Sequence, residues 1–452
     1  MIKETARGMA VHMLTRVEVE GAYANLLLQK NILRLTDSRD RQFVTMLVNG
    51  TLKHRLTLDY ALRRHLSKPM SSLPHEVRSI LRIGAFQVLY VDKVPPAVAV
   101  NESVELAKGF PKFTGLVNVV LRKVMEKGWD IPWPDSKREA VRYISVRYSH
   151  PEWLIQRWLK RWGIEETEAL CKANNEPSQT WIRTNTLKIS REGLRDRLTE
   201  EGITVELGTR GPESLRIQDF GAVDQLESFQ EGLFTVQDES SQLVAHVVDP
   251  KPGESVLDAC SAPGGKTTHL AQLMQNEGEI LAFDVHAHKL ELIDQLAQKL
   301  GITIIQTQLG DARDLPGIRL GSQDRVLVDV PCSGLGVIKR KADLRWQKEE
   351  QDLKELPSLQ LAILERAASC VKEGGVLVYS TCTTEPEENF ELVKMFRLAH
   401  PEFEPVNLVD ALPFTLEEPR DIQQASKGMI QFLPHRHGMD GFFLAEFRRR
   451  EV

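Results

Sequence analysis

Two cysteines near the C-terminal end of the sequence each follow an aliphatic run that predicts a buried strand. Cys332 lies in DVPCSG after RVLVDV, and Cys382 lies in YSTCTTEPEEN after GVLVYST. Parallel strands of an open sheet end at one edge, so both thiols are expected to face one crevice. Paired thiols suit methyl transfer to carbon-5 of a pyrimidine, because a thiolate that adds to carbon-6 activates carbon-5 and must later be expelled. Asp329 is a candidate for protonating nitrogen 3 of the ring.

The alternative for either thiol is an inert cysteine packed under a loop, since most free cysteines serve only as small buried hydrophobes. The chain has five cysteines, an odd number without CxxC pairs, which fits neither a disulfide framework nor a zinc site. We therefore expect reduced thiols and no metal.

The segment ESVLDACSAPGGKTTHLAQL has the pattern of a strand, a glycine-bearing loop and a helix. Pro263, Gly264 and Gly265 permit a tight turn and leave room for a ligand at the helix N-terminus. The next candidate strand ends in Asp284, which is placed to bind ribose hydroxyls. The loop matches neither GxGxxG nor a P-loop, so an adenosine-like group is expected rather than a dinucleotide or a nucleoside triphosphate.

Acidic residues follow successive candidate strands at Asp258, Asp284, Asp311 and Asp329. Four carboxylates at one sheet edge suit hydroxyls, an exocyclic amine and an ammonium group, whereas they would repel phosphates. S-adenosylmethionine has these groups and a sulfonium. The alternative for any single aspartate is a helix cap or a turn residue.

Charge is distributed unevenly along the 452 residues. Residues 1–150 carry 24 Lys and Arg against 14 Asp and Glu, whereas the remainder carries 34 against 49. The first third is therefore the expected polyanion-binding part, although solvated helix faces would also give this excess. No apolar run is long enough to span a bilayer and no signal peptide is evident, so a cytoplasmic protein without membrane contact is expected.

The apolar periodicity predicts a multidomain chain. Residues 1–139 have helical spacing throughout, residues 140–229 mix two helical stretches with short strands in a small α+β module, and residues 230–452 alternate strands and helices as in a doubly wound, Rossmann-like α/β domain. The terminal GFFLAEFRRR alternates and is expected to form an antiparallel edge strand.

Three of these segments resemble a known family. DACSAPGGKT, DVPCSG and YSTCTTEPEEN resemble the cofactor, PC and TC motifs of the NOL1/NOP2/Sun group of RNA cytosine-5 methyltransferases, and RHGMDGFFLAEF resembles a late motif of the group. SRDRQFVTMLVNGTL, VPPAVAVNESVELAK and GLVNVVLRKV resemble the NusB-like RNA-binding domain. The resemblance covers nearly the whole chain.

The resemblance implies a role for each matched residue. Cys382 is expected to be the nucleophile and Cys332 to assist release, an order that spacing alone leaves open. The expected cofactor contacts are Cys260, Ser261, Ala262, Pro263, Gly264, Gly265, Lys266, Asp284, Asp311 and Asp329. The implied substrate is a cytosine of small-subunit (16S) ribosomal RNA, unstacked and free of most ribosomal proteins, and the implied enzyme is a monomer.

Two alternatives stay open. A DNA cytosine methyltransferase would use the PC thiol as nucleophile, so a functional TC thiol argues against that class. An antitermination or assembly factor with a vestigial catalytic domain would bind RNA without chemistry, and the presence of all the expected residues argues against it.

Overall fold

The computed structural model describes residues 5–451. Residues 1–4 and 452 lie outside the described residues. The first predicted domain begins with residues 1–4, and the last one ends with residue 452. By packing, the chain divides into one unit of residues 1–176 with 338–350 and a second of residues 177–337 with 351–452. The domain boundaries expected after residues 139 and 229 stay predictions.

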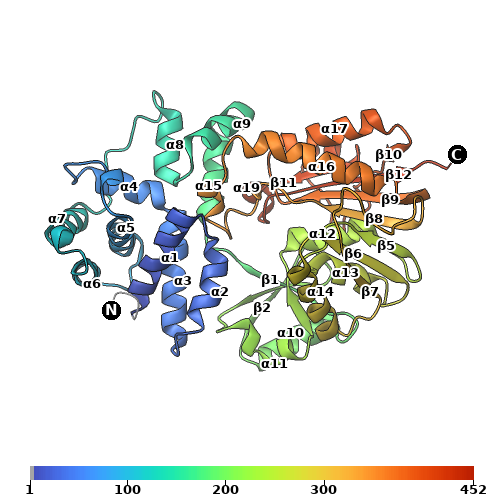
Figure 1. Ribbon diagram of the computed structural model, residues 1–452, viewed down its shortest axis with the longest axis horizontal. Coiled ribbons are helices and arrows are strands. Elements are labelled where there is room, and N and C mark those ends of the chain that lie inside the picture. The colour runs from blue at the N-terminus through green and yellow to red at the C-terminus, as the bar shows by residue number, and fades with distance from the viewer. Residues whose placement is uncertain (1–4, 452) are drawn as a thin grey trace. The chain divides into compact units, whose positions relative to one another are not determined.

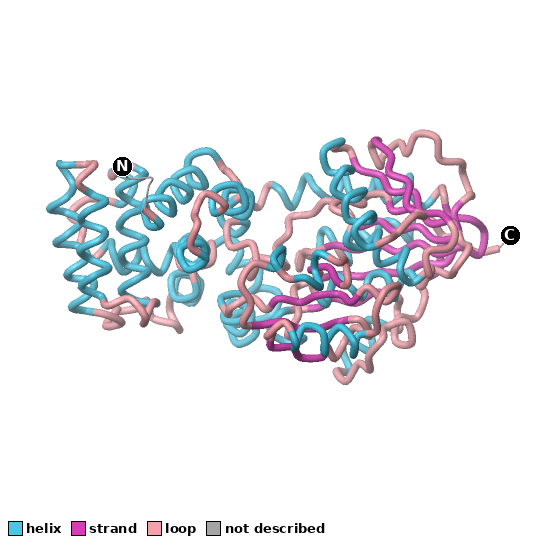
Figure 2. The backbone as a smooth tube through the Cα atoms, turned by 90° about the horizontal axis from the view of Figure 1, so that it is seen from below, coloured by secondary structure: helices cyan, strands magenta, loops and turns pink. Residues whose placement is uncertain are grey.

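The first unit is helical, as predicted (Figure 2). Its helices are α1 (Ala6–Glu20), α2 (Ala24–Ile32), α3 (Ser38–Lys53), α4 (Arg55–Arg63), α5 (His75–Tyr90), α6 (Pro96–Ala107), α7 (Pro111–Lys127), α8 (Ala140–Tyr148), α9 (Glu152–Asn175) and the short α15 (Leu344–Gln347). Asp37 caps α3 by accepting the N–H of Arg39, and prolines begin α6 and α7, where a missing N–H costs nothing. Leucine, valine and isoleucine side chains of α1, α3, α5 and α7 form one buried core.

Residues 338–350 fold into this helical unit although the PC motif directly precedes them in the sequence. The Arg345 guanidinium is fully buried and donates to the carbonyl of Ser149 at 3.0 Å and to Asn175 Oδ1 at 2.9 Å. The Trp346 ring nitrogen donates to the carbonyl of Leu52 at 2.7 Å. The sequence analysis did not predict this packing.

A small antiparallel sheet begins the second unit. It has the order β2–β3–β1–β4, with β1 (Thr180–Thr184), β2 (Thr204–Leu207), β3 (Ser214–Gln218) and β4 (Phe234–Val236), and is covered by α10 (Arg191–Glu200), with the short α11 (Glu227–Gln230) beside it. This is the predicted α+β module. β4, which lies in the segment GLFTVQ, pairs with β1 in this sheet.

The larger sheet of the second unit has the order β10–β12–β9–β8–β5–β6–β7, with β11 also paired to β12 (Figure 1). Its central strands are parallel: β5 (Ser255–Asp258), β6 (Glu279–Asp284), β7 (Ile305–Leu309), β8 (Gln323–Asp329) and β9 (Val371–Thr381). β10 (Phe403–Pro405), β11 (Met429–Phe432) and β12 (Phe442–Arg449) are antiparallel. The α/β prediction is confirmed, but the prediction that β12 is an edge strand is wrong, because β9, β10 and β11 all pair with it.

Helices cover both faces of this sheet. α12 (Glu239–Val248), α13 (Gly265–Leu273) and α14 (Ala287–Leu300) pack on one face, and α16 (Asp352–Ala368) and α17 (Phe390–Ala399) pack on the other, with α18 (Pro419–Ala425) and α19 (Pro434–His437) beside β11. The parallel strands are therefore buried on both sides, which explains their unbroken aliphatic runs. Among residues 5–451, none of the helices has the length and apolar character to cross a bilayer.

Candidate active site

The two thiols singled out in the sequence lie in contact. Cys332 Sγ and Cys382 Sγ are 3.3 Å apart, and both side chains are half-buried. They meet because β8 and β9 are neighbouring parallel strands in which Asp329 pairs with Ser380, and each cysteine follows its strand within a few residues. The bond to Cys382, together with burial, raises the pKa of the Cys332 thiol well above its ordinary value.

A half-buried cation pairs with the acid that ends β8. Lys266 Nζ donates to Asp329 Oδ2 at 2.7 Å, and Ser380 Oγ donates to Asp329 Oδ1 at 2.6 Å. Burial opposes the charge of Lys266, but attraction to Asp329 outweighs it and raises the pKa of the ammonium group. Cys382 adds to this rise and therefore lies within electrostatic reach of Lys266. The pair thus places a proton-bearing cation and an acid beside the thiols.

A second layer of polar groups joins the loop of Cys332 to the loop of Cys382. The hydroxyls of Ser333 and Thr383 are 2.8 Å apart. The buried Glu388 accepts from the Ser333 hydroxyl, from the Ser333 N–H at 2.8 Å and from Gln360 at 2.8 Å. Burial raises the pKa of Glu388 despite these bonds. The residues next to both cysteines are thereby fixed by one carboxyl group.

The loop before β12 closes against the same two segments. Gly441 N–H donates to the Gly336 carbonyl at 2.9 Å, and Gly336 N–H donates to the Cys382 carbonyl at 3.0 Å. A Cβ at Gly336 would collide with the carbonyl oxygen of Gly441. Three segments distant in sequence therefore meet at a point that only glycine permits. His437, which lies in the segment RHGMDGFFLAEF, forms a hydrogen bond with Asp421 at 2.9 Å.

The glycine-bearing loop lies between β5 and α13. Gly264 has φ +97° and is followed directly by α13, whose first N–H groups have no partner within the helix. The N–H and the hydroxyl of Ser261 both donate to the Phe283 carbonyl, at 2.8 and 2.9 Å, next to Asp284. The loop is thus held against the end of β6.

The four aspartates converge on Cys260. After burial, the charges of Asp258, Asp329, Asp284 and Asp311 raise the pKa of this thiol well above its ordinary value. Their own partners differ. Asp311 is paired with Arg313 at 2.6 Å and is 39% exposed, Asp284 accepts the N–H of His286 at 2.9 Å, and the buried Asp258 accepts from the Thr267 hydroxyl at 2.8 Å.

Comparisons with known proteins agree with this architecture. Residues 245–448 match the family model described as 16S rRNA methyltransferase RsmB/F, residues 4–126 match the NusB family, and residues 150–224 match the ferredoxin-like domain of RsmF/B-like methyltransferases. The probable ribosomal RNA small subunit methyltransferase B of Bacillus subtilis (strain 168) is 40% identical over 456 residues, which is 100% of both chains. This chain belongs to the RsmB/F family of 16S rRNA methyltransferases.

Solved structures of relatives share the fold. The crystal structure of PH0851 superposes with a TM-score of 0.81 at 30% identity, covering 98% of this chain and 99% of that one. NSun6 from Pyrococcus horikoshii with SFG superposes with a TM-score of 0.58 at 26% identity, covering 66% of this chain and 97% of that one. The family resemblance and the fold class predicted from the sequence are confirmed.

Family membership makes the chain a methyltransferase with S-adenosylmethionine as methyl donor. The residues of the site fit this cofactor. Asp258 Oδ1 is buried and has no hydrogen-bond partner among the described residues, which is unusual unless a ligand group such as an ammonium satisfies it. Burial raises the pKa of Asp258 to about 7, so a cationic partner would favour its ionised form. Asp258, the Gly264 turn and Asp284 would hold the cofactor.

The sequence analysis missed Arg183 of β1. This guanidinium is 1% exposed and donates to the Gly265 carbonyl at 2.6 Å, to the Thr268 hydroxyl at 3.0 Å and to Gln237. The small sheet therefore braces the first turn of α13, where the cofactor loop ends. The only sequence signal is an arginine among the apolar residues of TWIRTNTL.

Proposed function

We propose that this enzyme methylates carbon-5 of a cytosine in small-subunit ribosomal RNA through a covalent bond between Cys382 and carbon-6 of the base. The single observation that carries the proposal is the 3.3 Å contact between Cys332 Sγ and Cys382 Sγ. Methyl transfer to oxygen or nitrogen needs no thiol, whereas transfer to carbon-5 needs one thiolate to add and a further group to complete release.

The family resemblance supports Cys382 as the nucleophile and Cys332 as the group that assists release, and the proposed order of events uses these roles. Cys382, as thiolate, adds to carbon-6, and electron density moves to carbon-5. S-adenosylmethionine supplies the electrophilic methyl group. Cys332 then takes the carbon-5 proton, the carbon-6 to sulfur bond breaks, and Cys382 leaves as thiolate. Cys332 acts as this base in its thiolate form, after passing its own proton to solvent water, and its raised pKa makes that thiolate strongly basic.

Asp329 contributes through its pairing with Lys266. Both Asp329 oxygens accept hydrogen bonds, from Ser380 and Lys266, as an ionised carboxylate does. A proton that reaches nitrogen 3 of the ring through Asp329 must therefore be supplied by Lys266. We propose that the Lys266–Asp329 pair stabilises the ring while Cys382 is attached.

The substrate is proposed to be 16S ribosomal RNA before most ribosomal proteins bind. The target base must be unstacked to reach half-buried thiols, which a single-stranded or incompletely assembled region permits. The basic residues of the first 150 positions are proposed to bind the RNA backbone. A cytoplasmic, monomeric enzyme is consistent with this role and stays a proposal.

The experiment is a comparison of two variants on protein-free 16S RNA with S-adenosylmethionine. Cys382→Ala should abolish both methylation and covalent attachment, and Cys332→Ala should accumulate a protein–RNA adduct that survives denaturing electrophoresis. An adduct found only with Cys382→Ala would exchange the two roles. Bisulfite sequencing of the product RNA should show one protected cytosine, and a methylated product without one would refute carbon-5 of cytosine as the target.

A further inference from the structure

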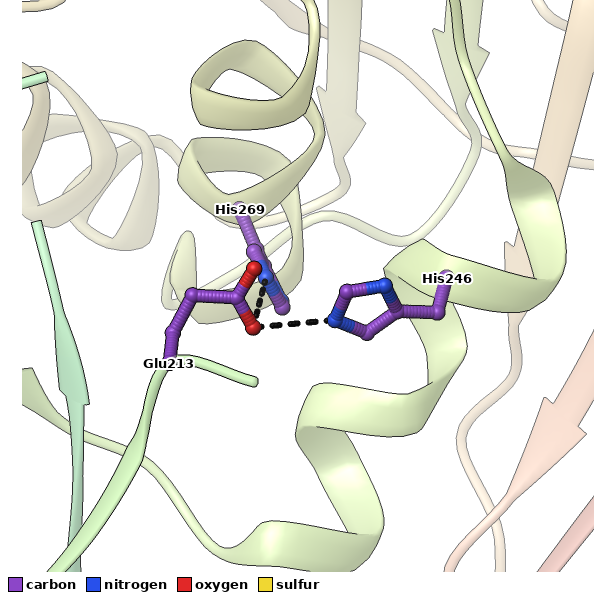
Figure 3. Close-up of side chains that lie close together, drawn as sticks. All are labelled: Glu213, His246 and His269. Carbon is purple, nitrogen blue, oxygen red and sulfur yellow. Dashed lines mark hydrogen bonds and ion pairs between the residues drawn. The ribbon is translucent and has the colours of Figure 1, made fainter. Parts of the chain in front are cut away.

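Three side chains outside the thiol site point toward one another in the second unit (Figure 3). Glu213 directly precedes β3, His246 lies on α12 and His269 lies on α13. Glu213 Oε2 is 2.9 Å from His246 Nε2 and 3.7 Å from His269 Nε2. One ligating atom from each residue lies within 4.8 Å of the other two. Among residues 5–451, these three form the group of histidine, cysteine and acidic side chains whose ligating atoms lie close enough together to hold a metal ion.

His269 is a buried polar side chain without a hydrogen bond. Its ring is 0% exposed, and neither Nδ1 nor Nε2 has a hydrogen-bond partner within residues 5–451. Buried imidazoles are almost always bonded, so an unbonded ring aimed at a carboxylate calls for a missing partner. Burial and the charge of Arg183 lower the pKa of His269 to about 3, so the ring is neutral at physiological pH and keeps a lone pair for a ligand.

We infer that Glu213, His246 and His269 bind a divalent transition-metal ion of the zinc type. Two imidazole nitrogens and one carboxylate oxygen are a common donor set for zinc, whereas calcium and magnesium prefer oxygen donors alone. A tetrahedral ion about 2.1 Å from each ligand holds its ligand atoms about 3.4 Å apart. The two distances from Glu213, 2.9 and 3.7 Å, bracket this value, and the two imidazole nitrogens lie within 4.8 Å of each other, so side-chain rotations that draw the histidines together would complete the site.

Charge and access also fit such an ion. Glu213 is held ionised, since its hydrogen bond with His246 at 2.9 Å and its proximity to His269 lower its pKa against the cost of burial. The nearby Arg183 donates its hydrogen bonds to Gln237, Thr268 and the Gly265 carbonyl, and it interacts with Glu213 through its charge alone. The His246 side chain is 15% exposed, which leaves an opening for the ion and for a water or hydroxide as the fourth ligand. A hydroxide would offset the added charge beside Arg183.

The metal would join the small sheet to two helices of the larger one. Glu213 is fixed through its backbone carbonyl, which accepts from the N–H and the hydroxyl of Thr184 at 2.9 Å each. His269 lies one turn into α13, whose N-terminus carries the cofactor loop. The ion would therefore have a structural role and stiffen that helix. This inference is independent of the proposed reaction, and its failure would leave the thiol chemistry untouched.

The test is metal binding by the full-length chain after removal of any affinity tag and bound metal. The thiols Cys332 and Cys382 are also potential ligands, so the measurements use a Cys332→Ser/Cys382→Ser background. Addition of Co²⁺ alone should give the visible absorption bands of a tetrahedral nitrogen and oxygen site at one equivalent per chain. Competition by Zn²⁺ alone should remove these bands, and Zn²⁺ should raise the melting temperature.

Variants locate the site. His246→Gln and Glu213→Gln should weaken Co²⁺ binding by roughly 100-fold or more, since even indirect changes cost 10- to 100-fold. His288→Gln is the matched control, because His288 is exposed in the same unit, and it should bind Co²⁺ as the background does. Each variant is first shown to melt cooperatively without metal. Absence of the bands, or equal binding by His246→Gln, would overturn the inference and leave an ordered water as the partner of His269.

Discussion

Cys332 Sγ and Cys382 Sγ lie 3.3 Å apart, and the hydroxyls of the next residues, Ser333 and Thr383, lie 2.8 Å apart. The loops that carry Cys332 and Cys382 are thus joined at two successive positions, by the pair of sulfurs and by the pair of hydroxyls. We expect the Ser333–Thr383 contact to stay formed when a base enters between the thiols. Ser333 and Thr383 would then set the spacing of the two sulfurs without taking part in the reaction.

Mild oxidation should link the two thiols reversibly. Peroxide removes two protons and two electrons from the pair, giving one disulfide and two waters, and the sulfurs need to approach by little more than 1 Å. Because the pKa of Cys332 is raised, the reaction should quicken as pH rises. Counting free thiols with a maleimide after denaturation should show five falling to three, with activity lost and then restored by dithiothreitol.

Cys332→Ala is the control for this oxidation and should keep all of its remaining thiols under the same treatment. Inactivation of the unmodified enzyme with five titratable thiols would contradict the prediction.

Glu388→Gln should impair catalysis more than cofactor binding. The glutamine amide replaces one of the two acceptor oxygens, so the Ser333 hydroxyl or the Gln360 amide loses its partner at a cost of about 1–3 kcal/mol. The affinity for S-adenosylmethionine, measured by calorimetry, should change little while the methylation rate falls by about tenfold or more. Glu391→Gln, an exposed change on α17, should alter neither. Equal losses in rate and cofactor affinity would indicate a general collapse of the site instead.

Gly336→Ala should destabilise the protein and displace Cys332. The new methyl group has no space against the Gly441 carbonyl, and overpacking of this kind costs about 1–3 kcal/mol. Melting temperature and methylation rate should both fall. Gly221→Ala, at a position with nothing within 4 Å of the added Cβ, should leave both near their original values. A fully active Gly336→Ala enzyme would show that the backbone contact is dispensable.

Cofactor affinity should depend on the protonation of Asp258. Its pKa in the folded protein is about 7, above the ordinary value of 3.8, because of burial. The protonated Asp258 therefore contributes folding stability at low pH, and this contribution is lost as pH rises through 7. Over the same pH range Asp258 becomes the carboxylate that the ammonium group of the cofactor needs as a partner. The dissociation constant for S-adenosylmethionine should fall between pH 6 and 8.

Asp258→Asn should bind the cofactor more weakly and without this dependence. Asp324→Asn is the control, because the pKa of Asp324 is lowered and the residue lies at the end of β8 away from Asp329. The pH dependence of cofactor affinity should persist in this variant. An unchanged profile in Asp258→Asn would assign the titration to another group.

The parts of the fold that follow from periodicity were predictable. Buried parallel strands produce unbroken aliphatic runs, so β8 and β9 and the thiols after them could be placed at one sheet edge from the sequence. Strand order was not encoded in those runs. The alternation in β12 fits any half-buried strand, and its central position depends on β10 and β11, which are short and weakly patterned.

Buried charged residues were the least predictable feature. Arg345 stands in IKRKADLRWQKEE, which has the composition of a solvated loop. It is nevertheless fully buried, and its guanidinium donates hydrogen bonds to the backbone carbonyls of Ser149 and Asn174. Arg183 is a similar case, since its partners Gln237 and Thr268 lie 54 and 85 positions away in the sequence. No local pattern reports such partners.

This packing also changes how RNA binding is best tested. Deletion of the N-terminal helices would uncover Arg345 and Trp346, which are buried or half-buried against them, and the truncated chain would fail for structural reasons. Neutralising exposed charges leaves the core intact.

Arg64, Lys123 and Lys127 are exposed and form the basic cluster chosen for that test. Burial lowers the pKa of His65, and the charges of these three residues lower it further while Glu126 opposes them, as expected if the three cations lie near His65. Changing all three to glutamine should weaken binding of 16S RNA and reduce the slope of log affinity against log salt by about 2 to 3, one for each lost phosphate contact. Lys394→Gln/Arg397→Gln, on exposed positions of α17, should leave the slope unchanged. The same slope in the triple variant would place the RNA on another surface, and filter binding over a range of salt concentrations measures the difference.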